Sequence, residues 1–196
     1  MGRRSTELNT IGLVVNPAAG KDIRRLVAHG SVFGNREKVN YTIRILLGFD
    51  QITTAPIKLI YMPDPYELIE TVIDEVGKSL KNIEFEKAPI TVFGDDADTT
   101  HFTQFIAKKP KVAALVVLGG DGTNRLVAKY SRNIPLFSIS AGTNNVFADN
   151  VEPTIFGMAL GYFINGWVKK NQVLERKKIL RIFREGIEMG IALVDM

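Results

Sequence analysis

Short apolar runs alternate with amphipathic stretches along most of this chain. Five runs have the length and the β-branched content of strands, at residues 11–15, 58–62, 89–93, 112–118 and 136–139. Several stretches between them place apolar residues three or four positions apart, as the buried face of a helix does. This alternation is typical of βαβ units. It predicts an α/β domain with a Rossmann-like, mainly parallel sheet and helices on both of its faces.

The same pattern predicts helices at residues 21–29, 36–47, 64–76, 98–106, 124–130 and 154–164. Asp64 before Pro65 has the composition of a helix start, and Asp98 or Thr99 is expected to cap a later helix. Residues 112–118 are apolar at every position. A strand at the centre of a parallel sheet has this composition because helices cover both of its faces.

The pattern changes near residue 168. Residues 178–183 and 187–194 are two strand-like segments in succession, and Glu185 and Gly186 have the composition of the turn between them. We therefore expect a nucleotide-binding domain at 1–168 and an antiparallel hairpin within 169–196 that begins a β-rich second domain. Since so few residues remain, we expect either part of a longer protein or a minimal relative. An exposed apolar strand edge there would favour homo-oligomers.

Composition narrows the function classes. The formal net charge is +4, from 25 Lys and Arg against 21 Asp and Glu. This mild excess suits a small anionic ligand, and the sequence has no dense basic stripe interleaved with aromatic residues, so nucleic acid is not an expected partner. The chain has no cysteine, which excludes disulfides and thiol chemistry. It has no apolar stretch of membrane-spanning length and no signal peptide, so we expect a cytoplasmic protein.

The strongest chemical signal is the sequence Gly119, Gly120, Asp121, Gly122, Thr123, between the all-apolar run and a predicted helix. Glycines allow a phosphate to approach the backbone and permit positive φ, and the helix directs its positive N-terminal end at the same place. Asp121 could bind Mg²⁺ or take the proton of an attacking hydroxyl, and Thr123 could donate to a phosphate oxygen. A plain strand-to-helix turn with an Asx motif is the alternative without a ligand.

Two further loops follow predicted strands. The first contains Asn16 and Gly20, and Asn16 could bind a ribose or a phosphate, although Asn-Pro is also common in ordinary turns. The second contains Gly142, Thr143, Asn144 and Asn145, and the two side-chain amides in this glycine loop suit recognition of a base or ribose. Parallel strands bring their carboxyl ends to one edge of a sheet. We therefore expect Asn16, Asp121, Thr123 and Asn145 around one cleft.

These three loops resemble those of the NAD kinase and diacylglycerol kinase-like superfamily, and within it the ATP-NAD kinase-like family that includes the acetoin-catabolism X proteins. The resemblance covers roughly residues 10–165. It implies ATP and Mg²⁺ as cofactors, phosphoryl transfer to a hydroxyl of a small acceptor such as NAD, and a β-rich domain that completes the acceptor site. It also implies that Asp121 is the base or metal-linked carboxylate and that the nucleotide contacts Asn16, Gly20, Gly119, Gly120, Gly122, Thr123, Gly142, Thr143, Asn144 and Asn145.

Two departures from this resemblance keep other functions open. Leu126 stands where relatives carry an acidic residue, and Val146 follows Asn145 where lipid kinases tend to carry an aspartate. One alternative is a lipid kinase of the diacylglycerol or sphingosine type, which an amphipathic membrane-docking element would favour. The sequence shows no convincing element of that kind. The other alternative is a nucleotide-binding module without catalysis, which Leu126 and the short second part favour.

Overall fold

A parallel five-stranded sheet forms the centre of the protein, as the apolar runs predict. The computed structural model describes residues 9–20, 33–141 and 145–193. The strand order is β3-β2-β1-β4-β5, and every neighbouring pair is parallel. The strands are β1 (Asn9–Val15), β2 (Ile57–Tyr61), β3 (Ile83–Lys87), β4 (Val112–Gly119) and β5 (Leu136–Ser140).

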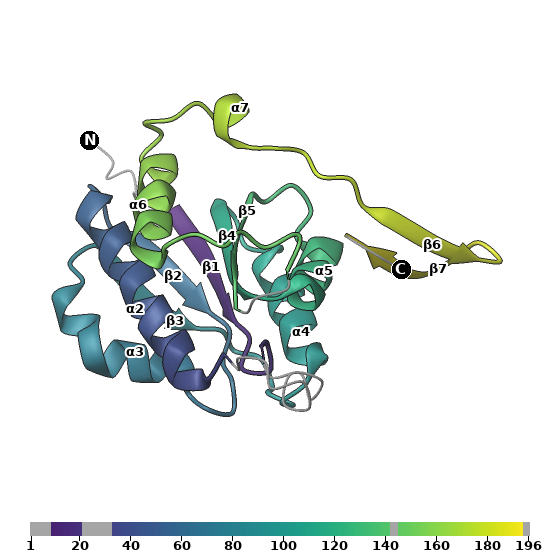
Figure 1. Cartoon of the computed structure of the whole chain (residues 1–196), viewed down its shortest axis with the longest axis horizontal. Coiled ribbons are helices and arrows are strands. Elements are labelled where there is room, and N and C mark those ends of the chain that lie inside the picture. Colours follow the sequence, from purple (N-terminus) through teal and green to yellow (C-terminus); the bar gives the residue numbers. More distant parts are fainter. Residues whose placement is uncertain (1–8, 21–32, 142–144, 194–196) are drawn as a thin grey trace, which may run out of the picture.

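Helices cover both faces of this sheet (Figure 1). One face packs against α2 (Asn35–Ile52), α3 (Leu68–Val76) and α6 (Pro153–Ile164). The other packs against α4 (Asp96–Ile106) and α5 (Asp121–Tyr130). Two short helices complete the described part, η1 (Gly77–Ser79) and α7 (Lys170–Val173). The helix predicted at 21–29 lies outside the described residues.

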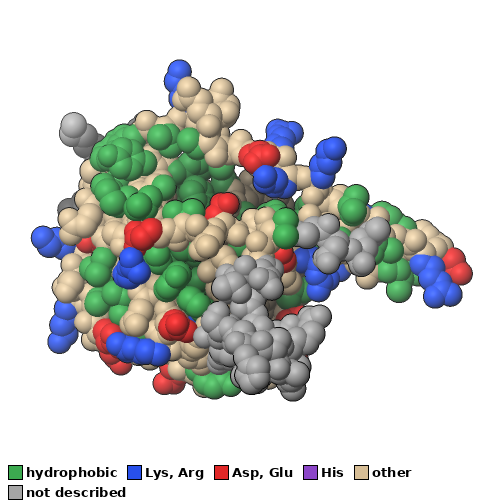
Figure 2. All heavy atoms as spheres, in the orientation of Figure 1, with side chains coloured by type: hydrophobic (Ala, Val, Ile, Leu, Met, Phe, Trp, Pro, Cys, Tyr) green, Lys and Arg blue, Asp and Glu red, His purple; other side chains and the backbone are tan. Residues whose placement is uncertain are grey.

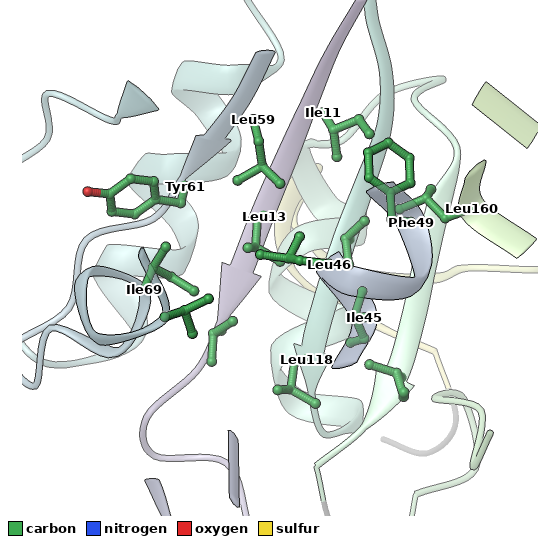
Figure 3. Packing of buried hydrophobic residues seen from close by; sticks show 14 of the residues in the cluster. Ile11, Leu13, Ile45, Leu46, Phe49, Leu59, Tyr61, Ile69, Leu118 and Leu160 are labelled. Atoms are coloured by element: carbon green, nitrogen blue, oxygen red, sulfur yellow. The ribbon is translucent and has the colours of Figure 1, made fainter. Parts of the chain in front are cut away.

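The side chains of β1 point alternately to the two faces of the sheet, so this strand contributes to both hydrophobic clusters. Ile11 and Leu13 lie in the cluster beneath α2, α3 and α6, while Val14 lies in the cluster beneath α4 and α5. Figure 3 shows Leu13 beside Leu46 and Ile11 beside Phe49, and both of these neighbours belong to α2. β4 is buried along most of its length, as its unbroken apolar sequence predicts for an interior strand.

Glycines allow α2 and α6 to pack closely over the sheet. A Cβ placed on Gly157 would overlap the backbone carbonyl of Ile45, and one placed on Gly48 would overlap the carbonyl of Thr154. A larger residue at either position would therefore separate the helices. This close contact with α2 holds α6, the helix that follows β5, over the sheet.

The third strand differs from the sequence prediction. The apolar residues 89–93 form no strand, and β3 occupies the preceding segment Ile83–Lys87 instead. β3 lies at the edge of the sheet, where only part of its surface is covered, so Glu and Lys alternate with Ile83 and Phe85. Phe93 is exposed in the connection to α4. The apolar composition of residues 89–93 does not make them a strand, because no neighbouring strand in the described part of the chain pairs with them.

Two predicted helix starts also need correction. α3 begins at Leu68, because the Asp64 carboxylate accepts N–H groups of Tyr66 and Leu68 and so holds a turn ahead of the helix. The cap of α4 is Asp95, whose carboxylate accepts the N–H of Ala97. Asp98 lies inside α4 rather than at its cap.

The predicted antiparallel hairpin is confirmed at the end of the described chain. β6 (Leu180–Arg184) pairs with β7 (Ile187–Ala192). Glu185 and Gly186 both have left-handed φ, 52° and 80°, as two-residue hairpin turns require. Hydrophobic side chains are exposed along this projecting hairpin (Figure 2). The division into domains 1–168 and 169–196 stays a prediction. None of the described helices combines the length and the apolarity needed to span a membrane.

Candidate functional site

The loops after β1 and β4 meet at the point where the strand order reverses. β1 is followed along the chain by β2 on one side of it, and β4 lies on its other side. The Asn16 N–H donates to the Leu118 carbonyl at 3.1 Å, so the two loops leave the sheet side by side. Open α/β sheets bind ligands at this type of switch point, outside the carboxyl ends of the strands.

The Asn16 side chain joins these two loops. Its Nδ2 donates to Thr123 Oγ1 at 2.8 Å, and its Oδ1 accepts the N–H of Ala18 at 2.9 Å. Thr123 is buried in the first turn of α5. The loop after β1 is therefore held against the start of α5 by a side chain that sequence analysis selected for ligand contact.

The start of α5 presents unused backbone donors. Within the described residues, the N–H groups of Gly122 and Thr123 have no hydrogen-bond acceptor, as expected in the first turn of a helix. A Cβ placed on Gly122 would meet no atom of the described residues within 4 Å. The described part of the chain therefore leaves space beside this turn, and the helix adds a positive potential at its start.

The reason for these glycines differs from the prediction. None of Gly119, Gly120 and Gly122 has positive φ. Instead, a Cβ on Gly119 would lie 2.8 Å from Thr123 Cβ, and one on Gly120 would lie 3.0 Å from Asn145 Oδ1. Close approach of neighbouring side chains, rather than left-handed backbone, excludes larger residues at Gly119 and Gly120.

Asp121 holds the loop that follows β5. Its Oδ2 accepts the N–H of Val146 at 2.9 Å, and its Oδ1 accepts the N–H groups of Phe147 at 3.0 Å and Ala148 at 3.4 Å. Both carboxylate oxygens therefore contact backbone amides in this structure. This contact was not predicted, because the sequence pattern suggested only a ligand or a local turn for Asp121.

Asn145 reinforces the same contact. Its Nδ2 donates to Ser140 Oγ at 2.6 Å, and its Oδ1 accepts the Asp121 N–H at 3.3 Å. The loop after β5 thus folds back over the start of α5 on two side chains. Gly142, Thr143 and Asn144, also predicted to contact the nucleotide, lie outside the described residues.

Gly20 brings the first loop to the end of β5. It has a φ of 75°, and a Cβ there would lie 2.5 Å from the Ala141 carbonyl oxygen and 2.7 Å from Phe33 Cβ. Both the backbone conformation and the lack of space require glycine at this position. The structure therefore brings Asn16, Gly20 and residues 119–123 to one edge of the sheet, together with Asn145.

Sequence comparison with known proteins agrees with this arrangement. The model of the ATP-NAD kinase N-terminal domain matches residues 11–168. The chain belongs to the ATP-NAD kinase family. It is also 30% identical over 195 residues to the acetoin catabolism protein X of Cupriavidus necator, with 94% of this chain and 53% of that protein covered. The chain spans about half the length of this relative.

Family membership directs attention to metal ligands and to Leu126. Among the described residues there is no group of three or more His, Asp or Glu side chains that could hold a metal ion. Leu126, at the position where an acid was expected, is half-buried in α5. Asp121 is the carboxylate in the turn itself.

Two buried polar residues beside the site were missed. Lys38 in α2 is 0% exposed, and its Nζ donates to the Pro17 carbonyl at 2.6 Å. Asp64, after β2, is 6% exposed. Burial raises the pKa of Asp64 above its ordinary range, although hydrogen bonds from the Tyr66 and Leu68 amides and the positive charge of Lys38 oppose that rise.

Helical spacing offered a signal for Lys38. It precedes Thr42, Ile45 and Phe49 by four, seven and eleven residues, and these three are all buried. Lys38 therefore lies on the inner face of α2 by period alone. Because lysine is usually exposed, this spacing alone does not single out Lys38 as a functional residue.

Proposed function

We propose that the protein is an ATP-dependent kinase that transfers a phosphoryl group to a hydroxyl of a small acceptor, with NAD as one candidate. The observation that carries this proposal is that the N–H groups of Gly122 and Thr123 have no acceptor within the described residues. They lie at a turn where a Cβ on Gly122 would meet no described atom within 4 Å. A polyphosphate fits such a place because it supplies the missing acceptors and the negative charge that the helix end favours. Membership of the ATP-NAD kinase family supports the same reaction class.

Phosphate binding would use the backbone of residues 119–123. The glycines keep the approach clear, and Asn16 orients the Thr123 hydroxyl through the bond from its Nδ2. Gly20 and Asn145 would shape the two sides of the nucleotide site. Gly142, Thr143 and Asn144 remain proposed contacts.

Asp121 is the proposed proton acceptor. The acceptor oxygen would bond to the γ-phosphorus as the bond from that phosphorus to ADP breaks, and the hydroxyl proton would pass to the carboxylate. Mg²⁺, when bound with the nucleotide, would neutralise charge on the phosphates. Backbone amides already contact both Asp121 oxygens, and these contacts would orient the carboxylate toward the same edge.

A module that binds nucleotide without catalysis is the second candidate. The hydrogen bonds between Asp121 and the loop after β5 favour it, because they give this carboxylate a structural role that needs no reaction. Leu126 favours it as well, because this position supplies no carboxylate for a metal. A lipid kinase stays an alternative that an assay with lipid alcohols would test.

Asp121→Asn separates these candidates. If Asp121 is the base, phosphate transfer from ATP to NAD or to another acceptor should fall about a hundredfold, whereas ATP binding measured by calorimetry should persist. Because asparagine keeps only one of the two acceptor oxygens, the thermal unfolding temperature serves as the control for the loop contact. Transfer by the variant at the parent rate would limit Asp121 to holding the loop. Absence of transfer by the parent to NAD and to diacylglycerol would favour the binding module.

A further inference from the structure

Lys38 is a fully buried lysine that lies beneath the candidate phosphate site. It belongs to the first turns of α2, and its side chain has 0% exposure. Burial of a lysine amino group is costly unless polar partners replace its water, so such residues are rare. Retention of a lysine here, where an apolar side chain of the same length would pack, calls for a specific partner.

One such partner is the backbone of the loop after β1. Lys38 Nζ lies 2.6 Å from the Pro17 carbonyl oxygen. Pro17 stands between Asn16, which bonds to Thr123, and Ala18, whose N–H donates to Asn16 Oδ1. The Lys38 side chain therefore holds the peptide unit next to the residue that joins the two loops.

The charge of Lys38 also reaches the next strand end. It is one of the influences on the Asp64 carboxyl, which lies after β2 and accepts the amides of Tyr66 and Leu68. Glu70 acts on the same carboxyl with the opposite sign. Lys38 thus interacts with groups at the carboxyl ends of both β1 and β2.

We propose that Lys38 is a positioning residue of the nucleotide site. Its buried amino group holds the Pro17 carbonyl, and through it Asn16 and the Thr123 hydroxyl, in the arrangement that binds polyphosphate. This inference rests on the proposed function for its ligand, whereas the loop geometry itself is independent of any ligand. Lys38 is not placed among the groups that touch the reacting atoms.

The test compares Lys38→Met with Arg36→Met. Methionine keeps the approximate length of the buried side chain and removes its donor. Arg36 precedes Lys38 by two residues in α2 but points to solvent, where it pairs with Glu75. Affinities for ATP and for inorganic tripolyphosphate are measured by calorimetry, and exchange of the Ala18 and Ala19 amide protons is measured by NMR without ligand.

Lys38→Met should weaken both ligands about tenfold or more, the size expected from loss of one charge-assisted hydrogen bond. It should also speed exchange at Ala18 and Ala19, whose N–H groups donate to Asn16, while core amides of β4 stay as slow as in the parent. Arg36→Met should change neither quantity. A generally destabilised protein would instead show faster exchange in β4 as well.

Parent-like affinity in a folded Lys38→Met protein, or exchange at Ala18 and Ala19 as slow as in the parent, would overturn the proposal. Faster exchange in β4 as well as in the loop would also overturn it, since Lys38 would then be a general stability residue. If the parent itself binds neither ATP nor tripolyphosphate, the proposed function fails. The exchange measurement would then still support or refute the positioning role, so the two failures are distinguishable.

Discussion

The carboxyl edge of the sheet and the C-terminal hairpin differ in how far their side chains are held by contacts with other parts of the chain. At the sheet edge, Asn16 bonds to Thr123 across 107 residues of sequence, and Asp121 bonds to Asn145 and Val146 across 24 and 25 residues. In the hairpin, β6 is exposed along its whole length, and apolar residues such as Phe183 and Ile187 face solvent. The hairpin follows from local turn geometry, whereas the sheet edge follows from distant contacts.

This difference indicates in which of the two regions a substitution should have the larger effect on stability and binding. A residue at the sheet edge is restricted by its neighbours in space, so a small change there should alter both stability and binding. A residue in the exposed part of the hairpin is restricted mainly by its own backbone, whereas Ile191 and Ala192 at the end of β7 are buried. Matched substitutions in the two regions should therefore give unequal results.

The largest contrast is expected for two valine substitutions. Gly157→Val would force a side chain into the α2 backbone, and we expect a loss of unfolding free energy of about 3 kcal/mol or more. Gly190→Val places its side chain in open space on β7, where a β-branched residue is favourable, and should cost little. Urea denaturation of both variants measures this. Equal losses would refute the close α2–α6 contact.

Two alanine substitutions at positive φ should separate stability from binding. Gly20→Ala and Gly186→Ala both impose a left-handed conformation, at φ 75° and 80°, and each should cost about 1 kcal/mol or more. A Cβ at Gly20 would also overlap Ala141, whereas Gly186 is surrounded by open space. ATP affinity by calorimetry should therefore fall about tenfold or more for Gly20→Ala alone. An equal effect of Gly186→Ala would place the hairpin in the site.

Sequence patterns predicted what depends on local order. The unbroken apolar run at β4 and the turn at Glu185 and Gly186 were predictable because backbone geometry and burial act on neighbouring residues. The edge strand β3 was missed because its alternation with charged residues gives a weak signal, while the apolar run after it is a connection. Pairing with β2 makes residues 83–87 the strand, and the apolar content of residues 89–93 does not.

The meeting of these loops at one edge of the sheet was predictable from the sequence, but their contacts were not. The rule that parallel strands share a carboxyl edge was sufficient to group Asn16 with Thr123. It gave no indication that Asp121 would accept amides from residues 146–148, or that Lys38 would be buried beneath Pro17. Those contacts depend on how the loops fold back over the sheet edge. The spacing of apolar residues along the chain carries no information about that folding.

The smallest expected effect concerns Asp64 and pH. Burial raises the pKa of this carboxyl, so the folded state binds its proton more tightly than the unfolded state does. Unfolding free energy from this residue should therefore decrease as pH rises from the ordinary aspartate pKa of about 3.9 through the raised value. Asp64→Asn should remove that slope in urea denaturation across acidic pH. An unchanged slope would show that other groups cause it.

ATP binding to Gly122→Val tests the central proposal, phosphate binding at the start of α5, most directly. The position has no positive φ, and a Cβ there meets no atom of the described part of the chain within 4 Å, so the variant should fold with a stability close to that of the parent. We expect the valine side chain to obstruct the approach of a phosphate to the backbone of this turn, and calorimetry should detect a loss of ATP affinity of about a hundredfold or more. A folded Gly122→Val protein that binds ATP as tightly as the parent would place the phosphate site elsewhere and contradict the proposed function.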